Sequence, residues 1–221
     1  KNSKKKGNIV MSSYNYPTTA SAFIRAGLNI KFIDIEGNSL MSSYDQYLKG
    51  IDKNTVAVLT THYAGLNVHY LEKLKKLCTQ KKIFLIEDSA QALDSYHNGK
   101  PLGSFGDFSS FSFHETKNVH SVTGGMLICK SKKMHKIAKF ILDRGTDRAK
   151  VINGRKNKYE WVTLGSAFNM TDIQAAMLYD QILNLKNIKN QRKKLYNFYL
   201  KYFKIFRLDN HFYFNKINEN K

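Results

Sequence analysis

Two side chains stand where a ligand could be bound or chemically changed, Asp88 and Lys117. Asp88 follows the apolar run 83–86, and a carboxylate after a buried strand usually meets a ligand or a helix N-terminus. Lys117 follows a second apolar segment, 108–113, and its neighbours include Ser, His, Glu and Thr. A deprotonated lysine in such a place can attack a carbonyl compound. From the residues alone, a solvated surface lysine is the commoner case.

The elements that must position these two residues alternate along the first two thirds of the chain. Short segments rich in β-branched and aromatic residues predict strands at residues 9–11, 30–35, 55–61, 83–86, 108–113 and 125–129. Apolar residues at helical spacing predict helices at residues 18–27, 44–48, 68–80 and 132–144. The alternation predicts an α/β fold with a mostly parallel sheet and flanking helices. Ligands of such sheets lie beyond the carboxyl ends of the strands, where Asp88 and Lys117 are expected.

The last third of the chain changes character. Residues 145–165 are polar, basic and interrupted by glycines, which we interpret as a long loop near a site. Residues 171–203 predict one long helix or two in sequence. Residues 204–221 alternate weakly and then become polar, as expected for the start of a second domain that stops early. The expected domains are therefore residues 1–203 and 204–221.

Composition allows several classes of protein. Apolar residues make up 42% of the 221, which is enough for a sizeable core. The net charge of +19 indicates either an anionic partner or a bias of composition toward Lys and Asn. The charge is mostly Lys spread over the chain, whereas nucleic-acid readers favour Arg for bidentate contacts. A nucleic-acid partner is therefore not expected, and a phosphate-bearing small substrate fits either interpretation.

The cysteines and the N-terminus bear on the compartment. Cys78 and Cys129 form no close pair and no metal-ligand spacing, so buried free thiols are expected and a metal site is not. Free thiols are typical of a reducing compartment such as the cytoplasm. The sequence shows no signal peptide and no membrane span, so we expect no membrane partner.

Several segments resemble one family. IEDSAQAL (86–93), FSFHETKN (111–118) and TGG (123–125) are similar to motifs of the DegT/DnrJ/EryC1/StrS sugar aminotransferases. YNYPTTASAF (14–23) upstream and KYEWVTLGSAFNMTDIQAA (158–176) downstream keep the order and spacing, so the resemblance covers residues 9–203. It implies the large domain of a pyridoxal 5′-phosphate (PLP)-dependent transferase of the aspartate aminotransferase fold, fold type I.

The resemblance implies a role for five residues. Lys117 matches the lysine that carries the cofactor and moves protons at the substrate carbon. Asp88 matches the aspartate that keeps the pyridine nitrogen protonated. Gln91 matches a glutamine near the ring hydroxyl, and Ser112 a serine that bonds the phosphate. Tyr16 stands where the family stacks an aromatic ring on the cofactor face.

Other residues receive no firm role. His62 and Tyr63 follow a predicted strand, where either a site role or a structural one is possible. His114 and Glu115 follow the pattern of the subgroup, without an assigned role. Three further histidines are expected to be solvated: His97, His120 and His135.

The resemblance also implies parts that the chain does not contain. Family members begin with a segment whose helix N-terminus binds the cofactor phosphate, and they end with a small domain that helps to close the site. We therefore expect a large domain that is truncated at both ends. Many relatives also have an Asn that reaches the partner subunit's cofactor, at a position where this chain has Ala167.

The implied activity is a transamination. An amino acid, with glutamate as the expected donor, would give its amino group to a dTDP-linked 4-keto-6-deoxy sugar for cell-surface polysaccharide synthesis. Dehydratases of the family replace the lysine with His, so Lys117 favours the transaminase branch. Family members are homodimers, and a homodimer is expected here if the chain is complete enough. The alternative is an inactive truncated remnant, and a nucleic-acid binder is a third hypothesis that rests on charge alone.

Overall fold

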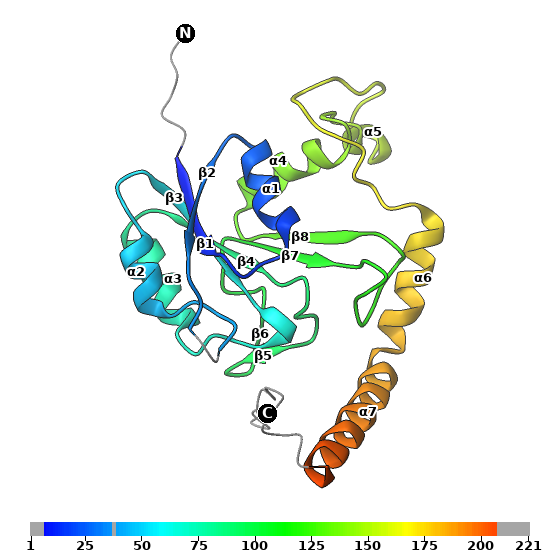
Figure 1. The fold of residues 1–221 in the computed structure, drawn as a ribbon. Helices are drawn as coiled ribbons and strands as arrows, with labels where there is room; N and C mark the ends of the chain where they lie inside the picture. Colours follow the sequence, from blue (N-terminus) through cyan, green and yellow to red (C-terminus); the bar gives the residue numbers. More distant parts are fainter. Residues whose placement is uncertain (1–6, 37–38, 207–221) are drawn as a thin grey trace.

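The computed structural model describes residues 7–36 and 39–206 and shows a layered α/β architecture (Figure 1). The strands are β1 (Asn8–Ser12), β2 (Asn29–Ile33), β3 (Thr55–Thr61), β4 (Phe84–Asp88), β5 (Tyr96–His97), β6 (Lys100–Pro101), β7 (Phe108–Ser112) and β8 (Gly125–Cys129). The helices are α1 (Pro17–Arg25), α2 (Tyr44–Gly50), the 3-10 turn η1 (Tyr63–Gly65), α3 (Leu71–Gln80), α4 (Lys132–Leu142), α5 (Ala149–Ile152), α6 (Asp172–Leu183) and α7 (Leu185–Ile205).

Six strands form one sheet in the order β2-β1-β3-β4-β7-β8. Neighbouring strands are parallel except for β7 and β8, which are antiparallel. The expectation of a mostly parallel sheet is therefore confirmed. Strands β3, β4 and β7 bring their carboxyl ends to one edge, and the loop that contains Lys117 joins β7 to β8.

The central strands β1 and β3 are buried on both faces, and successive side chains of each strand pack into different cores because they point to opposite sides. Ile9 and Met11 of β1 pack with Leu59 of β3 in a core on the α1 face. Val10, between them, packs on the other face in a larger core that includes Leu74 and further side chains of α2 and α3. One strand therefore contributes to two cores, and alternate residues along it face opposite sides of the sheet.

Local signals explain where several helices begin and end. Pro17 opens α1 at a position that requires no backbone N–H donor, and Gly27 has φ 82° just after its end. Ser43 and Gln46 form a capping box at the start of α2. Thr171 and Gln174 form another at the start of α6.

The structure decides one open alternative and adds two details. The segment 171–203 forms two helices in sequence, one of the two predicted possibilities, because the chain leaves helical geometry at Asn184 and resumes in α7. Residues 145–165 contain the short helix α5 within the expected loop. A hairpin of β5 and β6 was not predicted, although Asn98-Gly99 is a strong hairpin signal and both residues have positive φ.

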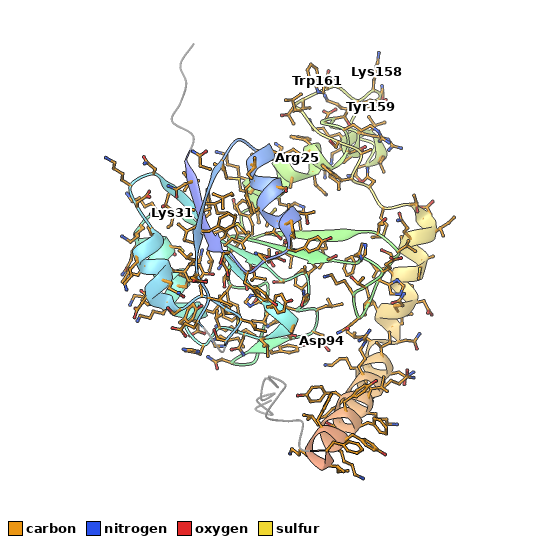
Figure 2. All side chains as sticks on the ribbon, viewed as in Figure 1. Arg25, Lys31, Asp94, Lys158, Tyr159 and Trp161 are labelled. Carbon is orange, nitrogen blue, oxygen red and sulfur yellow. The ribbon has the colours of Figure 1, made fainter. Side chains whose placement is uncertain are left out.

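The second half of the chain is far more exposed than the first. Strand β8 and helices α4, α6 and α7 contain no buried residue among those described. In Figure 1, α6 and α7 run along one side of the body, and α7 extends away from the sheet. Figure 2 shows Trp161 and Tyr159 at the far end of the 145–165 loop, and Trp161 is 75% exposed. Apolar surface on this scale is typical of surfaces that pack against further protein.

Two expectations about burial were wrong, whereas those for Cys78 and for His135, which is exposed, held; His120 is half-buried. His97 is buried rather than solvated, because the β5–β6 hairpin places its ring against Phe105. Cys129 is half-buried, since the outer strand β8 is covered less than the centre of the sheet. Cys78 is a buried free thiol as predicted, and burial raises its pKa to about 12.

The expected division of the chain into domains stays a prediction. Helix α7 continues through position 204 to Ile205, so the boundary falls within its last turn. The rest of the expected second domain, residues 207–221, lies outside the described residues. None of the helices in the described ranges combines the length and apolar character that crossing a bilayer requires.

Replacing a core leucine tests the layer formed by α3. Leu74→Ala removes a side chain that is fully buried between α3 and the sheet, and should lower the free energy of unfolding by about 2–5 kcal/mol. Leu164→Ala, at a position that is 81% exposed, should change it by less than about 0.5 kcal/mol. Urea denaturation followed by circular dichroism measures both, and equal effects would contradict the described core.

Candidate functional site

A cavity of about 960 Å³ lies at the carboxyl edge of the sheet, on the α1 face. Its lining comes from the loop after β1, from α1, from the ends of β3, β4 and β7, and from the loop between β7 and β8. All five residues predicted from the sequence line this one cavity: Tyr16, Asp88, Gln91, Ser112 and Lys117. They are separated by up to 101 positions in the chain, and the sheet brings them together.

Asp88 is the last residue of β4, and its side chain is buried. The hydroxyl of Thr19, on the first turn of α1, donates to Oδ2 at 2.9 Å. The backbone N–H of Ala90 donates to Oδ1 at 3.1 Å. Both partners are neutral, so they orient the carboxylate without cancelling its charge. A cationic group that enters the cavity would find that charge available.

Lys117 is half-buried in the β7–β8 loop, and its backbone N–H donates to the carbonyl of His114 at 2.9 Å. Gly124 closes the loop with φ 152°, and a Cβ there would lie 2.8 Å from both the Met170 Cε and the Ser121 Oγ. A side chain at position 124 would therefore strain the segment that presents Lys117.

Helix α6 holds the same loop from outside through two glutamines that the sequence analysis missed. The backbone N–H of His120 donates to Oε1 of Gln181 at 3.0 Å, and the Gln181 amide donates back to the His120 carbonyl at 2.8 Å. The Gln174 amide donates to the hydroxyl of Thr123 at 2.9 Å. The two glutamines are seven residues apart on α6 and so lie on one face of the helix. That spacing was the signal available in the sequence.

The other three predicted residues differ in how firmly they are held. Oε1 of Gln91 accepts from the backbone N–H of Ala64 at 2.8 Å. The hydroxyl of Ser112 accepts from the backbone N–H of His114 at 3.3 Å. Tyr16 is 70% exposed, so it lies at the edge of the cavity, and its stacking role stays a prediction.

A second aromatic pair at the cavity was not given a role by the sequence. Tyr14 and Tyr63 have ring centroids 4.9 Å apart, and the Tyr14 hydroxyl donates to that of Tyr63 at 3.2 Å. Both line the cavity together with Tyr16. Three tyrosines therefore contribute flat apolar surface and hydroxyl groups to the wall of one pocket.

Next to the cavity lies a buried acid–base pair, and one of its members, His62, is among the residues that line the cavity. Nε2 of His62 and Oε2 of Glu87 are 2.8 Å apart, and both side chains are 0% exposed. Glu87 also accepts three backbone N–H groups, those of Gly103, Phe105 and Gly106, at 2.9, 2.8 and 2.5 Å. Burial raises the pKa of Glu87, but the hydrogen bonds from His62 and these amides outweigh it and lower the pKa below its usual range.

The remaining candidates have smaller roles in the geometry. His114 lines the cavity and its Nδ1 lies 3.1 Å from the hydroxyl of Thr116, whereas Glu115 is exposed. No residue of the 145–165 loop lines the cavity. Within the described ranges, no group of three or more His, Cys, Asp or Glu side chains is placed to hold a metal ion.

The fold and the donor set define a class of protein. A cavity at the carboxyl edge of a parallel sheet, lined by a lysine, an aspartate and a serine, suits a phosphorylated aromatic aldehyde whose ring nitrogen is basic. This is the arrangement of a PLP-dependent transferase. The sequence model of the DegT/DnrJ/EryC1/StrS aminotransferase family matches residues 2–218, and the chain belongs to that family. The resemblance seen in the sequence is thereby confirmed.

Similar proteins include both enzymes and solved structures. GDP-perosamine synthase of Vibrio cholerae is 34% identical over 123 residues, which are 56% of this chain and 33% of that protein. PseC of Helicobacter pylori, an aminotransferase involved in the biosynthesis of pseudoaminic acid, shares 25% identity with a TM-score of 0.75, over 83% of this chain and 48% of that one. The putative sugar aminotransferase Spr1654 of Streptococcus pneumoniae, in its PLP form, has a TM-score of 0.79 at 24% identity, over 89% and 54%.

The comparisons settle the fold class and the cofactor of the family. The chain has the fold of the PLP-dependent aminotransferases, and PLP is the cofactor of the family, as predicted. The chain spans half or less of the length of the curated relatives it matches.

Substituting Glu87 tests the buried pair. Each Glu87 oxygen accepts at least one backbone N–H, so in Glu87→Gln the new amide must face a donor. We expect a loss of about 3–5 kcal/mol in the free energy of unfolding. Because the pKa of Glu87 is lowered in the folded protein, the wild-type advantage should be complete above pH 4.5, the ordinary value, and shrink as the pH falls below it.

Urea titrations between pH 7 and pH 3 measure this difference. Glu160→Gln, at an exposed carboxylate paired with Lys156, is the control and should cost less than about 1 kcal/mol at every pH. A Glu87→Gln deficit that stays constant down to pH 3 would argue against an ionised Glu87.

Removing one of the two α6 glutamines tests how the Lys117 loop is held. Gln181→Ala removes the acceptor of the His120 backbone N–H, so that amide should exchange with deuterium roughly tenfold faster. Gln191→Ala, at an exposed position on α7, is the control and should leave the exchange unchanged. Equal protection of residue 120 in both variants would show that α6 does not hold the loop.

Proposed function

We propose that this chain forms the cofactor-binding part of a transaminase that acts on a nucleotide sugar. The supporting observation is that the five residues of the family motifs line one cavity at the carboxyl edge of the sheet. The order FSFHETKN, with YNYPTTASAF before it and KYEWVTLGSAFNMTDIQAA after it, resembles dTDP-4-amino-4,6-dideoxygalactose transaminase. The expected acceptor is thus a dTDP-linked 4-keto-6-deoxy sugar, and the expected amino donor is glutamate.

Each residue has a role that fits its surroundings. PLP, when bound, supplies a protonated ring that withdraws electrons from the reacting carbon. The Asp88 carboxylate would hold the proton on the ring nitrogen. Its partners Thr19 and Ala90 are neutral, so they leave the negative charge of the carboxylate available to the ring. The Nζ of Lys117 would carry the cofactor in the resting protein, and would take a proton from the amino donor and return one to the sugar carbon.

Three further residues would bind and orient. The Ser112 hydroxyl would donate to the phosphate, and the Gln91 amide would face the ring hydroxyl while its oxygen stays on the Ala64 amide. The Tyr16 ring would cover the exposed face of the heterocycle, and this contact would lower its 70% exposure. The chain's high Lys content favours approach of an anionic nucleotide sugar.

The setting of the reaction is part of the same proposal. The free thiols Cys78 and Cys129 support a reducing compartment, and we propose the cytoplasm. The exposed apolar surface of β8, α4, α6 and α7 supports a homodimer. The product would serve cell-surface polysaccharide synthesis. The GDP-perosamine synthase relative makes GDP the competing choice of nucleotide.

The first experiment is a visible absorption titration with stoichiometric PLP, read after unbound PLP is removed, in which we expect the aldimine band to depend on Lys117. Wild type should show it, and Lys117→Ala and Lys117→Arg should not. Lys133→Ala on the exposed face of α4 is the control and should match wild type. A band that persists in Lys117→Ala would overturn the assignment, and no band in any variant would show that this chain alone does not carry the cofactor.

Substrate assays follow from the same variants. With glutamate and a 4-keto-6-deoxy sugar, wild type should form the 4-amino sugar, and Lys117→Ala should be slower by roughly a hundredfold to ten-thousandfold. Comparing dTDP-linked with GDP-linked acceptors measures which nucleotide is preferred. Equal rates in wild type and Lys117→Ala would contradict a transaminase.

A further inference from the structure

The residues at the ends of β3 and β4 divide between the two faces of the sheet. Thr60 is in register with Glu87, and Thr61 with Asp88. Registered neighbours of a parallel pair point to the same face, and consecutive residues point to opposite faces. The contacts agree, because Asp88 meets Thr19 of α1 whereas Glu87 meets the amides of residues 103–106. The two carboxylates are thus consecutive in β4 and lie on opposite faces of the sheet.

Glu87 joins three parts of the chain at this point. Its Oε1 accepts from Phe105 and Gly106, and its Oε2 accepts from Gly103 and contacts the ring of His62. Glu87 and the groups bonded to it form one anchor, which includes β4, the 103–106 segment and the end of β3. Because the side chains of Glu87 and His62 are 0% exposed, water cannot replace these bonds at low cost.

His62 is bonded to the Asp88 segment at two points. Its backbone N–H donates to the Asp88 carbonyl at 3.0 Å, beyond the last paired residues of β3 and β4. Its ring must place a proton on Nε2, because an ionised Glu87 can only accept. Nδ1 is buried and has no hydrogen-bond partner among the described residues. The bond to Glu87 is thus the polar contact that the described structure gives the ring.

We propose that His62, through Glu87, is a positioning residue that fixes the Asp88 carboxylate from the opposite face of the sheet. This inference rests on the proposed function, in which Asp88 bonds the ring nitrogen of the cofactor. Asp88 itself is oriented by a Thr19 hydroxyl and an Ala90 amide, both neutral. The fully buried His62–Glu87 pair sets where the backbone of residues 87 and 88 lies, and hence the position of the Asp88 Cα.

Three substitutions at position 62 separate positioning from simple stability. His62→Ala removes the ring. His62→Gln can place an amide N–H near the site of Nε2 and keep the bond to Glu87. His62→Asn is too short to reach Glu87 and replaces the alanine variant if that one does not fold. The control is Ile9→Ala, which removes a fully buried side chain of β1 from the core on the α1 face, does not line the cavity and is not bonded to Glu87.

The readouts are the ¹³C signal of the Asp88 carboxyl in the free protein, assigned with Asp88→Asn, and the PLP affinity from absorption. His62→Ala should move the Asp88 signal and weaken PLP binding roughly tenfold or more. His62→Gln should restore both toward wild type. Ile9→Ala should leave both unchanged, even where it lowers the melting temperature.

A folded His62→Ala with an unchanged Asp88 signal and wild-type affinity would overturn the proposal. Equal changes in His62→Ala and Ile9→Ala would also overturn it, because they would indicate a general loss of packing. If no Lys117-dependent band forms in wild type, the proposed function fails for this chain. The Asp88 signal of the free protein would still decide the role of His62.

Discussion

The alternation of side chains at the end of β4 is the constraint on which the site depends. Two carboxylates stand next to each other in the sequence, and strand geometry sends one to each face of the sheet. Glu87 goes inward, where a histidine and three backbone amides surround it. Asp88 goes to the cavity, where its partners are neutral. A one-residue slip of β4 would exchange the two environments and remove both the anchor and the site.

The same edge also gathers side chains from distant parts of the chain. Parallel strands end at one edge, so the loops after β1, β3, β4 and β7 meet there. The β7–β8 loop that presents Lys117 is held from outside by Gln174 and Gln181 of α6. The cavity therefore combines a rigid floor, made by the sheet, with a loop whose position depends on a peripheral helix.

Buried side chains are unevenly distributed between the two halves of the chain. Both described cores lie in the first half and use β1, β3 and β4 as their common centre. Helices α4, α6 and α7 expose apolar side chains instead, and α7 has aromatic residues in contact along its last turns, such as Phe198 and Tyr202. Burial per residue is what stabilises an element in water, so these helices are the ones expected to depend most on further protein contacts.

The sequence by itself determined most of the elements, the α/β class and the family. Apolar periodicity identified the six strands of the main sheet and most of the helices, because one face of each must be buried, and motif order identified five of the residues that line the cavity. It did not reveal the hydrogen bonds of Glu87, the burial of His97 or the hold of α6 on the Lys117 loop. These depend on contacts between residues far apart in the chain, such as residues 120 and 181. Local patterns carry no record of such contacts, and only the packed tertiary structure decides them.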